Sequence, residues 1–108
     1  MGRNSKDNSM MRYEELVRIS VRYNDYIHHP RLKIGFSSAS HKPLLDAHKF
    51  IKGVKKTLSE LDKEDKKLLL NEFFEKKDPF WWTKKYSKST YYRRRYSAVK
   101  NFMEIYSR

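Results

Sequence analysis

The sequence contains no cysteine and, among its 108 residues, only three glycines and three prolines. Without cysteine the chain can form neither a disulfide bond nor a zinc site with thiolate ligands, which fits the reducing cytoplasm. No apolar run approaches the ~20 residues that span a bilayer, and no signal peptide or targeting tail is visible. We therefore expect a cytoplasmic protein that does not insert into a membrane.

The sequence also lacks the common motifs of catalysis, since it has no Gly-rich phosphate loop and no His-Glu-x-x-His motif. His28 and His29 fall at the end of a predicted helix, where they interact favourably with the terminal carbonyl groups, so we do not expect them to bind a metal. Acidic residues such as Glu72 lie at helical spacing from lysines such as Lys76, a pattern typical of a solvated helix face. We expect no enzymatic activity, no cofactor and no metal site.

Positive charge dominates the composition. Lys and Arg number 25 against 13 Asp and Glu, which gives a formal net charge of +12 and a pI of about 9.9. This balance indicates an anionic partner, with nucleic acid favoured over a membrane surface. Residues 62–77 contain five lysines and five acidic residues, whereas residues 78–108 contain eight Lys/Arg against two acidic residues and carry +6. The excess charge is therefore concentrated near the C-terminal end.

Hydrophobic periodicity predicts an all-α fold of about five helices, arranged as a single domain over residues 12–108. Residues 1–11 are polar and are expected to form a flexible tail. The first helix is predicted over residues 12–28, where apolar residues recur at spacings of three and four, and Pro30 should end it. Residues 31–41 are rich in serine and are predicted to form a loop.

The helix predicted over Leu44–Leu61 has the most regular apolar pattern. Its apolar residues follow one another at steps of three and four: Leu44, Ala47, Ile51, Val54, Leu58 and Leu61. A continuous apolar seam of this kind packs against a partner helix, either within the same fold or from a second subunit in a homodimer. Gly53 weakens the helix by about 1 kcal/mol relative to alanine, so we expect it to mark a close helix crossing.

Capping residues predict where the next two helices begin. Asp62 is expected to cap a helix together with Asp65, three residues further on. The buried side of this helix consists of Leu69, Leu70, Phe73 and Phe74. Asp78 is expected to cap a short helix that has Pro79 at its first position and ends before Ser87.

The last helix begins after Ser87, whose hydroxyl can accept a hydrogen bond from the backbone N–H of Thr90. One side of this helix carries an apolar stripe formed by Tyr91, Ala98, Phe102 and Ile105. The opposite side, which we call the reading face, consists of Lys88, Ser89, Tyr92, Arg93 and Tyr96. Polar side chains on such a face can donate hydrogen bonds to base edges in the major groove of DNA.

The two helices within residues 78–106 predict a helix-turn-helix, because a connection this short forces a steep crossing and leaves the second helix protruding. At least one of the aromatic residues Phe80, Trp81 and Trp82 should pack beneath the second helix, and Tyr86 should close the turn on the core side. Basic residues around the reading face are candidates for phosphate contacts, which position a protein without specifying sequence. These candidates are Lys84, Lys85, Arg94, Arg95 and Lys100.

One segment resembles the helix-turn-helix of ArpU- and RinA-type phage transcriptional regulators and, more distantly, region 4 of bacterial sigma factors: Tyr86-Ser87-Lys88-Ser89-Thr90-Tyr91-Tyr92-Arg93, followed by Ala98. Both families carry a Ser-x-x-Thr opening and an alanine eight residues later. The resemblance extends back through Leu44–Leu61 and Leu68–Phe74. It departs at Trp81-Trp82-Thr83, which replaces the usual Glu-Ile-Ala run, and at Arg94, where these families usually place an apolar residue. The resemblance implies promoter-region binding and contact with RNA polymerase.

The sequence thus predicts a small transcriptional regulator that reads double-stranded DNA with the helix after Ser87 and is associated with the nucleoid. Two alternatives stay open. One is a protein-interaction module that binds RNA polymerase or a second copy through its aromatic and heptad surfaces. The other is a sequence-tolerant RNA-binding protein whose tyrosines stack on unpaired bases.

Overall fold

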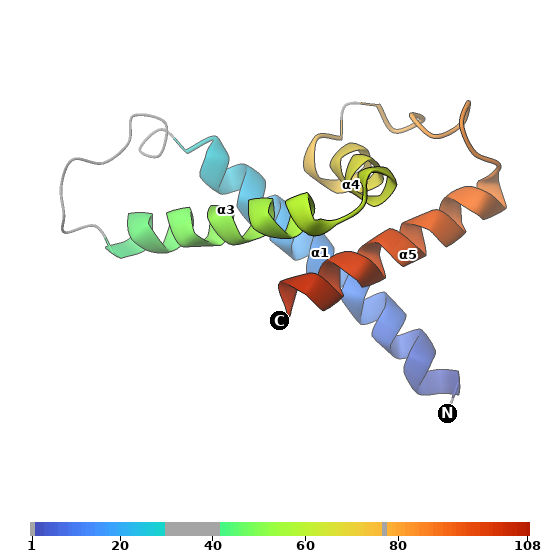
Figure 1. Cartoon of the computed structure of the whole chain (residues 1–108), viewed down its shortest axis with the longest axis horizontal. Helices are drawn as coiled ribbons and strands as arrows, with labels where there is room; N and C mark the ends of the chain where they lie inside the picture. Colours follow the sequence, from blue (N-terminus) through green and yellow to red (C-terminus); the bar gives the residue numbers. More distant parts are fainter. Residues whose placement is uncertain (1, 30–41, 77) are drawn as a thin grey trace.

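The computed structural model describes residues 2–29, 42–76 and 78–108, and every regular element in these ranges is helical (Figure 1). The elements are α1 (Gly2–Ile27), α3 (Lys42–Glu60), α4 (Lys63–Leu69), its π-helical continuation η1 (Leu70–Phe74) and α5 (Lys88–Tyr106). The all-α prediction is confirmed. The predicted loop over residues 31–41 and the predicted stop at Pro30 lie outside the described residues. Within the described ranges, no helix is both long and apolar enough to cross a membrane.

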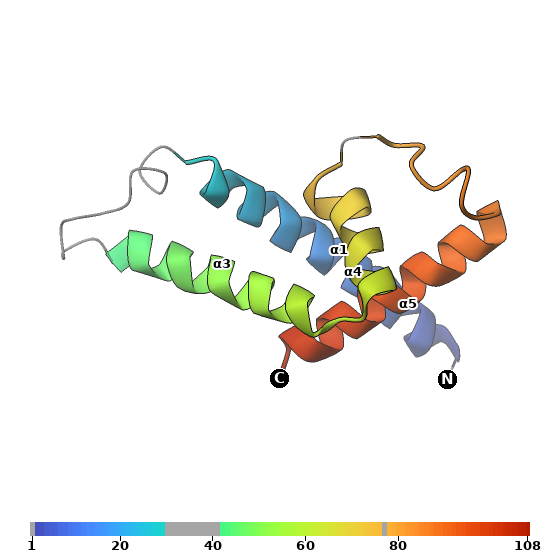
Figure 2. The same cartoon turned by 45° about the horizontal axis from the view of Figure 1, so that its top comes forward.

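Helices α1 and α5 cross near their middles, and the other helices pack around this crossing (Figure 1). Helix α3 runs beside the C-terminal half of α1, while α4 contacts α5 and η1 contacts α1 (Figure 2). The N-terminal half of α5, orange in both figures, extends away from α3. The first turns of α5 therefore lie at the edge of the molecule.

The core occupies the region where the helices meet. Its buried apolar side chains come from every helix: Leu16, Ile19, Val54, Leu58, Leu61, Leu68, Leu69, Phe73, Phe74, Ala98, Val99 and Phe102. Full burial of a leucine or phenylalanine side chain stabilises a fold by roughly 1.5–3 kcal/mol. Because Val54, Leu58 and Leu61 are buried within one chain, the apolar seam of α3 packs intramolecularly in this structure.

The predicted caps of α4 and α5 are confirmed. The Asp62 carboxylate accepts a hydrogen bond from the backbone N–H of Asp65 at 3.0 Å, directly before α4. The Ser87 hydroxyl oxygen accepts a hydrogen bond from the backbone N–H of Thr90 at 3.3 Å, directly before α5. Each cap satisfies a backbone donor that the first helical turn leaves unpaired. The Asp65 carboxylate also accepts a hydrogen bond from the Asn101 amide at 2.8 Å, which connects the start of α4 to α5.

Helix α1 begins at Gly2 rather than at the predicted Arg12. Residues 3–29 contain no glycine or proline, so no helix-breaking residue separates the predicted helix from the segment before it. Residues 2–11, which the composition predicted as a flexible tail, are therefore continuous with the first helix in the structure.

Gly53 does not mark a close helix crossing, and that prediction is wrong. A Cβ atom added at Gly53 would meet no neighbouring heavy atom within 4 Å. The carbonyl of Gly53 accepts a hydrogen bond from the Thr57 hydroxyl at 2.9 Å, a contact that any residue at position 53 can make. The packing of α3 therefore does not require glycine at this position.

The short helix predicted over residues 79–86 is absent, so the described residues hold one helix fewer than predicted and do not show the predicted helix-turn-helix. Residues 79–85 form consecutive turns instead. The Asp78 cap does form, since the Phe80 N–H donates to its carboxylate at 2.9 Å. The following backbone hydrogen bonds mostly span three residues, as from the Lys85 N–H to the Trp82 carbonyl, and do not continue as an α-helix. We call residues 79–86 the turn segment.

Candidate nucleic-acid interface

Helix α5 has a buried side and an exposed side that match the sequence pattern. Tyr91 is 4% exposed, Ala98 and Phe102 are 0% exposed, and Ile105 is half-buried beside them. All five residues of the reading face are exposed: Lys88, Ser89, Tyr92, Arg93 and Tyr96. At 1.5 Å per residue this face is about 12 Å long, which suits the width of the major groove of DNA.

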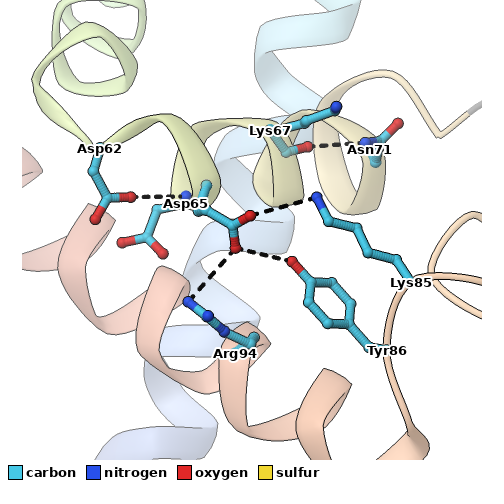
Figure 3. Close-up of polar contacts among 8 residues, drawn as sticks. Asp62, Asp65, Lys67, Asn71, Lys85, Tyr86 and Arg94 are labelled. Carbon is cyan, nitrogen blue, oxygen red and sulfur yellow. Dashed lines mark hydrogen bonds and ion pairs between the residues drawn. The ribbon is translucent and has the colours of Figure 1, made fainter.

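Glu64, in the first turn of α4, binds the end of the turn segment and one side of α5. Figure 3 labels its three partners, Lys85, Tyr86 and Arg94. Its carboxylate accepts a hydrogen bond from the Tyr86 hydroxyl at 3.1 Å. It also pairs with Lys85 at 3.5 Å and with Arg94 at 3.6 Å. The Tyr86 hydrogen bond, and after it the positive charge of Lys85, holds the pKa of Glu64 below its ordinary value. Tyr86 thus closes the turn segment against α4.

Glu72, in η1, binds the start of the turn segment and a second side of α5. It accepts hydrogen bonds from the Trp81 indole N–H at 3.1 Å and from the Tyr91 hydroxyl, and it pairs with Arg95 at 3.5 Å. The prediction that Glu72 pairs with Lys76 on a solvated face is wrong, because these more distant partners hold its carboxylate in a largely buried position. Burial raises the pKa of Tyr91, and the hydrogen bond and negative charge of Glu72 raise it further.

The tryptophans of the turn segment pack beneath α5, as predicted for at least one of the three aromatic residues there. The Trp82 ring stacks on Tyr91, and the Trp81 ring meets Tyr91 edge-on with centroids 6.3 Å apart. Phe80 is 68% exposed and adds nothing to the core. These ring contacts and the two glutamates together attach the segment to α4, η1 and α5.

The basic residues around α5 differ in whether a carboxylate compensates their charge. Lys85 and Arg94 pair with Glu64, and Arg95 pairs with Glu72. In the part of the chain that the structure describes, no carboxylate pairs with the remaining candidates: Lys84, Lys88, Arg93 and Lys100. The uncompensated charge therefore lies on the solvent side of α5 and in the segment that leads into it.

Helices α1 and α5 diverge from their crossing point toward their N-terminal ends (Figures 1 and 2). A groove is lined by residues of both helices. It has a volume of about 520 Å³ and is lined by Met10, Arg12, Tyr13, Tyr92, Arg95, Tyr96, Val99 and Lys100. We call it the α1–α5 groove. The Arg95 guanidinium lies over the Tyr13 ring at 4.8 Å and over the Tyr92 ring at 4.9 Å, so it bridges the two helices.

The sequence pattern predicts the α5 residues of this region as functional but gives no indication of Arg12 and Tyr13 of α1. These two residues reach the site because α1 crosses α5, and the periodicity of neither helix reports that contact. The pairing of arginine with tyrosine in Arg12-Tyr13 and Arg95-Tyr96 is no signal for the site, because it also occurs at Arg22-Tyr23, outside the groove. Comparisons of this chain with protein-family models, with curated proteins and with solved structures found no match.

Proposed function

We propose that this chain binds double-stranded DNA and that the reading face of α5 enters the major groove. The observation that carries the proposal is the distribution of charge around the helix. Lys88 and Arg93 are exposed and have no carboxylate partner among the described residues, whereas Arg94 and Arg95 are compensated by glutamates behind the helix. A helix with its free cations on the solvent side suits an anionic surface, and exposed arginine and serine side chains can donate to base edges.

The elements behind α5 support this proposal. Glu64 of α4 and Glu72 of η1 both bind α5, and the Trp82–Tyr91 stack attaches the turn segment to the same helix. A helix held in this way needs little further ordering when it binds. We propose that α4 with η1 and α5 act as the two helices of a helix-turn-helix-like unit, with the turn segment in the connection between them.

The resemblance to ArpU- and RinA-type regulators extends the proposal to transcriptional regulation at the nucleoid, with RNA polymerase as a second partner. One copy of the chain is sufficient for the proposed contact. Val54 and Leu58 are buried in the core of their own chain, so a homodimer through the Leu44–Leu61 seam would require α3 to leave that core. We therefore expect the protein to bind one site as a monomer.

Selection from a pool of random-sequence duplexes tests this function. We expect a preferred sequence to be enriched and to bind at least about tenfold more tightly than its scrambled version. Its affinity should fall with salt, with a slope of about −0.9 for each phosphate contact. Equal binding of the enriched and scrambled duplexes would contradict the proposal. No binding to any nucleic acid at about 50 mM salt would favour a protein partner instead.

A further inference from the structure

The α1–α5 groove contains residues that the duplex proposal leaves unused. A helix in the major groove presents the side chains that point away from the body of the protein. Arg12 and Tyr13 belong to a different helix, and Val99 is buried on the inner side of α5. The groove therefore shares Tyr92 and Tyr96 with the reading face but is completed by residues of α1, and its chemistry points to a second kind of contact.

The lining of the groove is mostly aromatic and apolar. Its tyrosines are Tyr13, Tyr92 and Tyr96, and its volume of about 520 Å³ falls within the roughly 300–1,000 Å³ of ligand sites. The Tyr13 ring lies edge-on against Phe73 with centroids 5.4 Å apart, and the Tyr92 ring is tilted against Tyr91 at 5.1 Å. Rings that are already held in place lose little conformational freedom when a flat ligand stacks on them.

The charge of the groove specifies an anionic ligand. Arg12 comes from α1 and Lys100 from α5, and none of the described residues that line the groove is acidic. Neither cation has a carboxylate partner among the described residues, whereas Glu72 compensates Arg95. The ligand should therefore combine a flat, apolar group with negative charge nearby.

We propose that the α1–α5 groove binds an unpaired nucleotide of a single-stranded nucleic acid. The base stacks on Tyr92 and Tyr96, and the flanking phosphates lie against Arg12 and Lys100. A duplex cannot fill the groove in this way, because its bases are already stacked on one another. This inference goes beyond the duplex proposal and does not rest on it.

The groove is not expected to distinguish DNA from RNA. Recognition of the ribose 2′-hydroxyl needs donors and acceptors placed against it. Among the described side chains that line the groove, the acceptors are the tyrosine hydroxyls and the Met10 sulfur, which accepts weakly. We therefore expect deoxyribose and ribose strands of the same length to bind alike.

Fluorescence anisotropy with labelled oligonucleotides of about 12 nucleotides tests the proposal on the full chain. Oligothymidylate and oligouridylate should bind within about threefold of each other, while an abasic strand of equal length should bind at least about tenfold more weakly. The abasic strand keeps the phosphates and lacks only the bases. Equal binding of the abasic strand would overturn the proposal, as would a preference of more than about tenfold for one sugar.

A pair of arginine variants tests the position of the site. Arg12→Ala and Arg18→Ala each remove one positive charge from α1, but only Arg12 lines the groove. Arg18 is exposed and pairs with Glu15. Arg12→Ala should weaken oligothymidylate binding about fivefold and reduce the salt slope by about 0.7, whereas Arg18→Ala should change the affinity less than about twofold. Equal losses in the two variants would overturn the assignment.

A pair of substitutions at one position tests stacking. Tyr96→Phe keeps an aromatic ring, whereas Tyr96→Leu has a side chain without a π-face. Because Tyr96 is exposed, neither change should unfold the protein, which thermal melting followed by circular dichroism can verify. The Phe variant should bind oligothymidylate about tenfold more tightly than the Leu variant. Equal affinities would show that the base does not stack there and would overturn the proposal.

Binding of oligothymidylate and of duplex DNA by the wild-type protein tests the groove proposal and the duplex proposal separately. Binding of oligothymidylate without binding of duplex would contradict the proposed function and would support single-strand binding in the α1–α5 groove. Binding of duplex without binding of oligothymidylate at about 50 mM salt would contradict single-strand binding in the α1–α5 groove and would leave the proposed function intact.

Discussion

The indole ring of Trp82 lies parallel to the phenol ring of Tyr91, with ring centroids 4.3 Å apart and 9° between the ring planes. Tyr91 is buried in α5, and its hydroxyl donates a hydrogen bond to Glu72 of η1. One tyrosine therefore joins three segments that are separate in sequence. Tyr91 thus contributes to holding α5 against η1 and the turn segment.

Tyr91→Phe should destabilise the protein by about 1.5–3 kcal/mol, because it removes a hydrogen bond to an ionised and largely buried carboxylate. The ring, and with it the stack on Trp82, is retained. The matched control is Tyr92→Phe, which removes a hydroxyl from the exposed neighbour and should change stability by less than about 0.5 kcal/mol. Urea denaturation measures both. Equal stabilities for the two variants would show that the Glu72 contact contributes nothing.

The sequence was sufficient to predict those parts of the fold that depend on local geometry. The caps at Asp62 and Ser87 need only a side chain and a backbone N–H three residues away, so they can be recognised from the sequence alone. The buried stripe of α5 follows from the 3.6-residue period in the same way. The exposed reading face is the other side of that stripe, and it was predictable for the same reason.

The turn segment shows where local reasoning fails. Asp78 and Pro79 favour a helix start, and the cap does form, but the helix does not continue. Glu64 and Glu72 bind side chains of the segment from 22 and 9 residues away in the chain, and these contacts outweigh the local preference. The α1–α5 groove could not be predicted for a related reason, since it exists only once α1 and α5 have crossed.

Gly53→Ala should stabilise the protein by about 1 kcal/mol. Alanine has a higher helix propensity than glycine, and the added methyl group meets no neighbouring atom within 4 Å. A thermal melt should show a higher Tm with an unchanged circular dichroism spectrum. A lower Tm would mean that position 53 lies against another part of the molecule in solution, which would contradict the packing of α3.

Glu64 should make stability depend on pH. Its folded pKa is lower than the ordinary value of 4.5, so the ionised carboxylate stabilises the fold above pH 4.5, and this stabilisation is lost as the pH falls from 4.5 through the folded pKa. Glu64→Gln keeps an acceptor for Tyr86 but carries no charge. The wild type should therefore be more stable than this variant at about pH 7, and the difference should be smaller at about pH 3.

Urea midpoints at the two pH values measure this effect. Glu60→Gln is a suitable control, because Glu60 is exposed near the end of α3 and makes no ion pair with any described residue. This control should match the wild type at both pH values. A difference between wild type and Glu64→Gln that stays constant with pH would exclude a role for the charge of Glu64.

Ala98→Glu should prevent folding or destabilise the protein by about 4 kcal/mol or more. Ala98 is 0% exposed and lies in the core, so the substitution places an unpaired carboxylate among apolar side chains. The control Ser97→Glu makes the same charge change on the exposed side of the same helix and should stay within about 0.5 kcal/mol of wild type. Similar melting temperatures for both variants would mean that α5 is rotated relative to this structure.

Substitutions of Arg93 and Lys84 distinguish sequence-specific recognition of DNA from non-specific electrostatic binding. Both are exposed, and each substitution by alanine removes one positive charge that no described carboxylate compensates. Arg93 lies in the second turn of α5, where its guanidinium can donate two hydrogen bonds to a guanine edge. Lys84 lies in the turn segment, outside the reading face, and is expected to contact only phosphate.

Arg93→Ala should therefore cost about 1–3 kcal/mol of binding free energy on the preferred duplex and reduce discrimination against scrambled DNA. Lys84→Ala should weaken binding to all duplexes equally and lower the salt slope by about one. Titrations of both variants on the selected and scrambled duplexes, repeated over a salt series, measure these effects. If each variant loses the same affinity on both duplexes, the basic side of α5 attracts DNA without reading it, and the protein is a non-specific binder rather than a regulator.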